Sequence, residues 1–282
     1  VIPSRLSILT KQINKDRGQC FYCAQCGRSC KVYADFSSSS ALVIPALKTG
    51  NVNLVTDSMV REVLTNKEGL ATGVSYVHKG DMQEYQVTGR TVILAASACE
   101  SARLMLNSKS PRHPNGLANS SNVVGKYLHD STGADMGGII PELFDRKRYN
   151  EDGVGGMHVY TPWWLDNNKL DFPRGYPIRY GGGFVMPLYG FNWGIENLNG
   201  TYKIKGKQKE AEGYGASLKE DYRYFFVAHV GMSCSGEAIA LVARYCEIDT
   251  PVVANLCIPV LLFLPKYTDP VIKQAQHITQ HL

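Results

Sequence analysis

Four of the eight cysteines lie close together near the start of the chain. Their spacing, Cys20-x-x-Cys23-x-x-Cys26-x-x-x-Cys30, matches bacterial ferredoxin loops, in which thiolates hold an iron–sulfur cluster. A disulfide framework would distribute its cysteines to join distant segments, so the crowding indicates metal or redox chemistry. Lys31 stands where ferredoxin loops have proline, and the single run excludes a two-cluster ferredoxin. These residues are compatible with three interpretations: an iron–sulfur cluster, a zinc ion, or disulfides and free thiols.

A second pattern that could do chemistry is a strand followed by small residues and a helix. Residues 91–95 are apolar and largely β-branched, which predicts a buried parallel strand. The run ends in Ala95-Ala96-Ser97-Ala98, and a helix is predicted over residues 100–107. Small side chains let the backbone approach a ligand, and the start of a helix offers unpaired N–H groups to an anion. Plain packing of a strand on a helix would give the same pattern.

The elements that must position these residues are predicted from alternation and turn chemistry. A short strand over 53–56 is followed by a stretch of alternating apolar and polar residues over 58–64. Strands over 71–77 and 84–88 come next, with turns between them, which makes a β-meander. Glycine, tyrosine and tryptophan become frequent after residue 131, and strands are predicted at 177–180 and 224–229. The serine run 37–40 is predicted to cap a helix, and residues 269–282 form a terminal helix.

Composition bounds the class of protein. The 282 residues are 44% hydrophobic and 20% charged, with a net charge of +5, which is ordinary for a globular protein. Because the basic residues are scattered, no nucleic-acid partner is expected. The longest apolar run, 258–264, is shorter than the roughly 20 residues of a membrane-spanning helix. The chain begins Val1-Ile2-Pro3 without an initiator methionine, so we expect an interior piece of a longer protein.

Several segments together resemble the glucose–methanol–choline (GMC) oxidoreductases. These are the meander 53–76, the strand–helix unit 92–108, and Val124-Gly125-Lys126-Tyr127-Leu128-His129-Asp130. The cysteine run is similar to that of a bacterial subgroup of gluconate and sugar dehydrogenases. The resemblance implies a mixed α/β fold with a partial, Rossmann-like FAD-binding domain over 1–130. An antiparallel-sheet substrate domain would follow over 131–245, and the tail 246–282 is not assigned to either.

The resemblance also implies roles for single residues. Val60 would present its backbone to the adenine ring of FAD, and Ala96 and Ser97 would line the turn beside the adenosine and pyrophosphate. The segment near the flavin-facing loop would contain Gly125, Leu128 and Asp130. The family's opening Gly-x-Gly-x-x-Gly is absent, and none of the seven histidines lies in a motif that makes it catalytic.

The implied reaction is FAD-dependent oxidation of a CH–OH group in an alcohol, sugar or polyol by hydride transfer to the flavin. Electrons would then pass to an acceptor protein or quinone, either directly or through a cluster on Cys20, Cys23, Cys26 and Cys30. We expect this chain alone to bind FAD weakly or not at all and to turn nothing over. The alternatives are an iron–sulfur electron-transfer module and a zinc-stabilised binding protein, and neither explains the meander and the strand–helix unit.

Overall fold

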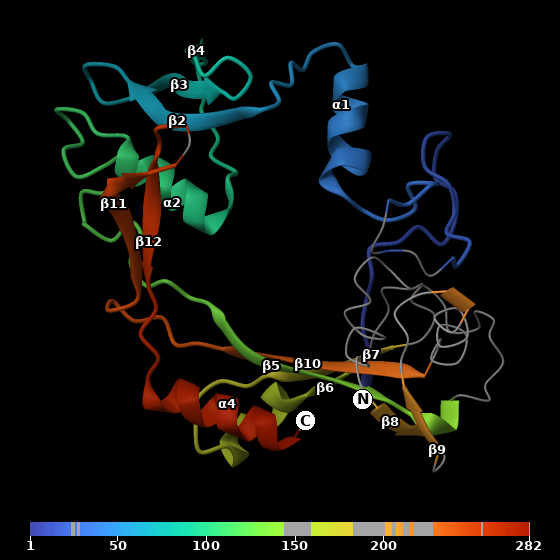
Figure 1. Ribbon diagram of the computed structural model, residues 1–282. Coiled ribbons are helices and arrows are strands. Elements are labelled where there is room, and N and C mark those ends of the chain that lie inside the picture. Colours follow the sequence, from blue (N-terminus) through green and yellow to red (C-terminus); the bar gives the residue numbers. More distant parts are fainter. Residues whose placement is uncertain are drawn as a thin grey trace. The chain divides into compact units, whose positions relative to one another are not determined.

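The computed structural model describes residues 1–23, 26, 29–143, 159–182, 201–204, 207–210, 215–216, 228–254 and 256–281 (Figure 1). The chain divides into two compact units, each assembled from separate stretches. Unit 1 comprises Val1–Val52, Ser131–Glu237 and Pro270–Leu282, and unit 2 comprises Asn53–Asp130 and Ala238–Asp269. Antiparallel sheets with short helices make up both units, which confirms the predicted mixed α/β class. The domain limits 1–130, 131–245 and 246–282 stay predictions.

Unit 2 is built on the predicted meander. Strands β2 (Ser58–Thr65), β3 (Ala71–His78) and β4 (Glu84–Thr88) form an antiparallel sheet in the order β2-β3-β4, which confirms the meander and the strands predicted at 71–77 and 84–88. Alternate residues of β3, Gly73, Ser75 and Val77, are buried, as expected for a sheet that covers a core with one face. Gly69 ends the first turn with a φ of +85°, a conformation that glycine adopts without strain.

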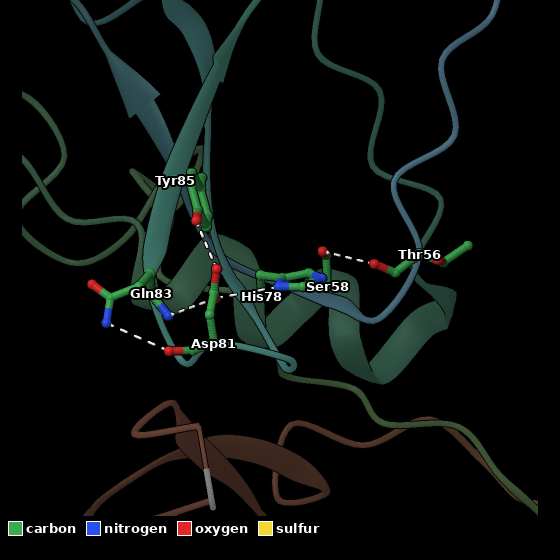
Figure 2. A network of polar contacts seen from close by, with 6 residues as sticks. All are labelled: Thr56, Ser58, His78, Asp81, Gln83 and Tyr85. Carbon is green, nitrogen blue, oxygen red and sulfur yellow. Dashed lines mark hydrogen bonds and ion pairs between the residues drawn. The ribbon is translucent and has the colours of Figure 1, made fainter.

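A polar network closes the turn between β3 and β4, as Figure 2 shows. The Asp81 carboxylate accepts hydrogen bonds from the Gln83 backbone N–H at 3.0 Å and from the Tyr85 hydroxyl at 2.7 Å. His78 Nδ1 lies 3.2 Å from the same carboxylate. The Gln83 N–H, followed by the Tyr85 hydroxyl, holds the pKa of Asp81 below its ordinary value. Because these side chains are solvent-exposed, the network explains the geometry of the turn and indicates no buried site.

Helix α2 (Ser97–Asn107) packs against β2, with β11 (Tyr245–Val253) and β12 (Pro259–Leu264) beside it in the same unit (Figure 1). The helix confirms the prediction over 100–107 and begins three residues earlier. Ala102 and Leu104 are buried in its interface, together with one charged residue, Arg103. Strands β11 and β12 pair with each other as an antiparallel hairpin.

Two predicted strands are wrong. Residues 53–56 and 91–95 lie in no strand and pair with none of the strands in the described part of the chain. Leu54 and Ile93 are 56% and 82% exposed, so neither segment is buried. The residue types favour a parallel strand, but such a strand also needs hydrogen-bonded neighbours and cover on both faces. The described residues supply neither.

Unit 1 contains an antiparallel sheet in the order β1-β6-β7-β10-β5. Its strands are β1 (Ile2–Pro3), β5 (Ser131–Ile139), β6 (Val159–Pro162), β7 (Pro177–Gly182) and β10 (His229–Glu237). Strand β7 confirms the prediction at 177–180. Of the strand predicted at 224–229, residues 224–227 lie outside the described residues, and β10 begins at His229. Strands β8 (Thr201–Ile204) and β9 (Lys207–Glu210) form a separate pair.

The predicted terminal helix is confirmed as α4 (Asp269–His281), which packs into the core of unit 1. Val271, Gln274 and Ile278 are buried, and their spacing of three and four residues places them on one helical face. Ile278 belongs to a cluster with Phe172, Tyr176, Ile178 and Cys234. The Tyr176 hydroxyl lies 2.6 Å from Nδ1 of His277, and Trp163 stacks on the Tyr176 ring.

Short helices follow the serine run in unit 1. A single π-helical turn, η1 (Ser39–Val43), leads into α1 (Ile44–Lys48). The Ser37 hydroxyl accepts a hydrogen bond from the Ser40 backbone N–H at 3.2 Å, as predicted for a serine cap. The remaining helical turns are η2 (Pro141–Leu143) and η3 (Trp163–Lys169). Among the described residues, no helix has the length and apolar character needed to cross a membrane.

Candidate functional site

Unit 2 contains a cavity of about 480 Å³, within the roughly 300–1,000 Å³ typical of small-molecule sites. Its wall combines β2, the neighbouring parts of β3 and β4, the segment 88–96 and one residue of α2. The lining is apolar and contains several small residues: Val60, Gly73, Val74, Val87, Thr88, Gly89, Thr91, Val92, Ile93, Leu94, Ala95, Ala96 and Leu104. The segment predicted as a buried strand therefore forms one wall of this cavity.

Two of the predicted cofactor residues, Val60 and Ala96, meet at the cavity. Val60 lies on β2 beside an irregularity in pairing, because the register with β3 shifts between Val60 and Glu62. Such a bulge leaves backbone groups outside the regular ladder. Ala96 comes from the segment that precedes α2, so the chain brings the meander and the helix start together around one space.

Ser97 follows Ala96 as the first residue of α2 and does not line the cavity. Its φ is +68°, an uncommon conformation for a residue with a side chain, and no side chain caps the N-terminus of α2. Uncapped N–H groups favour an anion at this end of a helix. Glu100 in the first turn already complements the helix dipole, and its charge is paired with Arg103.

The other three predicted cofactor residues lie along β11 and the segment before it. Gly125 accepts a hydrogen bond from the Cys246 N–H at 2.8 Å, and the Leu128 N–H donates to the Arg244 carbonyl at 2.8 Å. The Asp130 carbonyl accepts from Ala238 at 3.1 Å. None of the three is among the residues that line the cavity. Their roles toward a cofactor stay predictions.

Arg103 does not line the cavity but contacts its wall through Val60, and sequence reasoning missed it. It is 2% exposed, donates from Nη2 to the Val60 carbonyl at 2.9 Å, and donates from Nε to Glu100 at 2.7 Å. Its Nη1 is buried and finds no partner within the described part of the chain. The only signal in the sequence is a charged residue inside the otherwise apolar run Ala102-Arg103-Leu104-Met105-Leu106.

The cysteine run lies in unit 1, and hydrogen bonds from the Cys20 backbone and the Arg17 side chain hold the segments that flank it. The Cys20 N–H donates to the Leu9 carbonyl at 3.0 Å, and the Arg17 guanidinium donates to the carbonyls of Tyr33 and Asp35. All four cysteines are described, and all four thiols are free. Among the described residues, no group of three or more histidine, cysteine, aspartate or glutamate side chains is placed to hold a metal ion. The geometry does not support the predicted iron–sulfur cluster.

Thiol labelling at about pH 8 should separate the cysteines by exposure, because the thiolate is the reacting form. Cys23 and Cys257 are exposed and should react first. Burial raises the pKa of Cys234 to about 11 and also raises that of Cys246, so both stay protonated and should react only after unfolding. Mass spectrometry of labelled peptides measures this order. If Cys23 were protected while Cys257 reacted, the free-thiol state of the loop would be contradicted, and a chelator would then show whether a metal protects it.

A family model and two curated relatives match parts of this chain. Residues 4–132 match the family model described as GMC oxidoreductase. The chain is 38% identical over 179 residues to a 2-methyl-1,2-propanediol dehydrogenase of Mycolicibacterium austroafricanum, covering 64% of this chain and 29% of that protein. It is 30% identical over 120 residues to the fructose dehydrogenase large subunit of Gluconobacter japonicus, covering 43% of this chain and 22% of that protein.

The cavity therefore lies within the segment that matches an oxidoreductase family model. The match of residues 4–132 and the two relatives confirm the resemblance to GMC oxidoreductases seen in the sequence. The family binds FAD and oxidises alcohols and sugars. This chain spans less than a third of the length of the two curated relatives.

Proposed function

We propose that this chain contributes part of the FAD site of a dehydrogenase that oxidises CH–OH groups. The observation that carries the proposal is the cavity of unit 2, which joins Val60 to Ala96 within the segment that matches the family. The substrate class is an alcohol, sugar or polyol, in keeping with the names of the diol and fructose dehydrogenases. The acceptor of the electrons is a protein or a quinone.

The residues present fit the adenosine half of FAD. The lining is apolar, as an aromatic base requires, and Ala95 and Ala96 have no bulk to keep a ligand from the backbone. Val60 supplies backbone polar groups at the cavity wall. Ser97 and the uncapped start of α2 supply N–H groups for a phosphate, and the strained φ of Ser97 fits a functional position. Gly125, Leu128 and Asp130 keep their proposed place near the flavin-facing loop.

When bound, FAD would supply the hydride acceptor for the carbon that bears the hydroxyl group. The residues of this chain would bind the base against the apolar wall and orient the phosphates. We assign no proton-accepting side chain to this chain. A metal on the cysteine run would be a separate electron carrier, and the free thiols give it no support.

Affinity measurements on the full chain test the proposal. We expect ADP and FAD, which carry the adenosine half, to bind weakly, and FMN, which lacks it, to bind at least about tenfold more weakly. Ligand-observed NMR measures such affinities. Ala96→Trp should abolish ADP binding because it fills the cavity, whereas Ala71→Trp, at an exposed residue of β3, should not. Equal affinity for FMN and ADP, or ADP binding that survives Ala96→Trp, would contradict the proposed site.

A further inference from the structure

The open edge of β2 is held by two side chains of α2 and by Ser108, which follows the helix. β2 is the terminal strand of its sheet, and no strand among the described residues pairs with its outer edge. Arg103 donates to the Val60 carbonyl at 2.9 Å, and Asn107 donates to the Arg61 carbonyl at 3.0 Å. The Ser108 hydroxyl accepts from the Val63 N–H at 2.8 Å. We call Arg103, Asn107 and Ser108 the β2 clasp.

The clasp contacts β2 where its pairing with β3 is irregular. The pairing of β2 with β3 shifts register between Val60 and Glu62, so the ladder does not fix this part of β2 regularly. Val60 is the clasp partner that also lines the cavity. Of the three clasp residues, Arg103 is therefore the one whose hydrogen bond reaches the backbone of the cavity wall.

Arg103 is well suited to hold this position. Its guanidinium is planar and rigid, and the ion pair of Nε with Glu100 fixes its orientation within the same helix. A carbonyl oxygen has two lone pairs, so the bond from Arg103 leaves one on Val60 for a ligand.

We infer that Arg103 is a positioning residue that sets the affinity of the cavity for an adenine base by fixing the Val60 backbone. Adenine carries an amino donor, which matches the lone pair that Arg103 leaves on the Val60 carbonyl. This inference rests on the proposed FAD function and adds to it the residue that organises the base site.

The experiment compares Arg103→Met with Arg61→Met. Both remove one positive charge within the same part of unit 2, but Arg61 forms an exposed ion pair with Glu84 and its side chain takes no part in the clasp. We expect Arg103→Met to weaken ADP binding about tenfold, the worth of one ordinary hydrogen bond, and Arg61→Met to change it less than about twofold. Arg103→Lys, which keeps a donor, should recover part of the affinity.

Thermal unfolding of each variant separates positioning from folding. Met is close to Arg in volume and leaves Glu100 partly solvated, so we expect Arg103→Met to stay folded at the temperature of the titration. If it does not fold, Arg103→Lys gives the same comparison with an expected loss of several-fold. Wild-type affinity in a folded Arg103→Met would overturn the inference and leave the proposed function standing. Absence of ADP binding by the unmodified chain would instead overturn the proposed function, and the inference with it.

Discussion

Gly125→Ala should destabilise unit 2 by about 4 kcal/mol, the sum of two separate penalties. Gly125 has a φ of +79°, where a side chain is strained by about 1–2 kcal/mol. A Cβ added there would also lie 2.4 Å from the Cys246 carbonyl oxygen. This oxygen belongs to the backbone of β11, which cannot move without disturbing the hydrogen bond from the Cys246 N–H to Gly125. To avoid this clash, the segment around Gly125 would have to move away from β11 and lose that hydrogen bond.

Gly69→Ala provides the matched control. Gly69 has a similar φ of +85° in the same unit, but the nearest atoms to a Cβ added there are side-chain atoms of His113 and Arg112 at 3.1 and 3.2 Å, so these neighbours need to shift by only a few tenths of an ångström. We expect a loss of about 1–2 kcal/mol from strain alone. Hydrogen–deuterium exchange of peptides from β2 and β3 measures the stability loss of each variant. A loss of about 4 kcal/mol in Gly125→Ala should speed exchange about a thousandfold. Equal effects of the two substitutions would show that the contact of Gly125 with β11 is wrong.

Ile278→Ala should destabilise unit 1 by about 3–4 kcal/mol. The Ile278 side chain is fully buried in a cluster with Phe172 and Tyr176, so its truncation leaves a cavity in addition to the lost burial. Trp163 packs against the same cluster, so urea unfolding followed by tryptophan fluorescence reports directly on this core. The three tryptophans, at positions 163, 164 and 193, all lie outside the ranges of unit 2.

Ile272→Ala on the same helix is the control for Ile278→Ala. Ile272 is 46% exposed, and alanine is the better helix former, so we expect a change within about 0.5 kcal/mol. Similar losses for the two substitutions would mean that α4 does not pack through the face defined by Val271, Gln274 and Ile278.

The sequence predicts those elements that depend on residues next to one another in the chain. The strands of the meander follow from alternating residues and from turn residues such as Gly69, and α2 and α4 follow from their own composition. The strands predicted at 53–56 and 91–95 fail because a strand is a pairing, and residue types report only the preference of one partner. Segment 91–95 nevertheless contributes to the candidate site, since it lines the cavity that Val60 also lines.

The candidate site could be predicted only in part. Val60 and Ala96 were identified through a resemblance that depends on the order of several segments. Arg103 could not be, because a charged residue in a helix ordinarily faces solvent, and nothing near it in the sequence shows that it reaches back to β2. The cysteine spacing indicates joint chemistry, whereas the described thiols form no metal-holding group. Whether the four cysteine side chains meet at one centre depends on the path of the backbone between them as well as on their spacing in the sequence.

The most direct test of the central claim is the pattern of saturation transferred from the full chain to FAD in solution. If the cavity of unit 2 receives the adenosine half, the adenine protons should receive the strongest saturation, and the methyl protons of the flavin ring should receive less. The same pattern should disappear in Ala96→Trp. Saturation centred on the flavin ring, or adenine saturation that persists in Ala96→Trp, would contradict an adenine site between Val60 and Ala96.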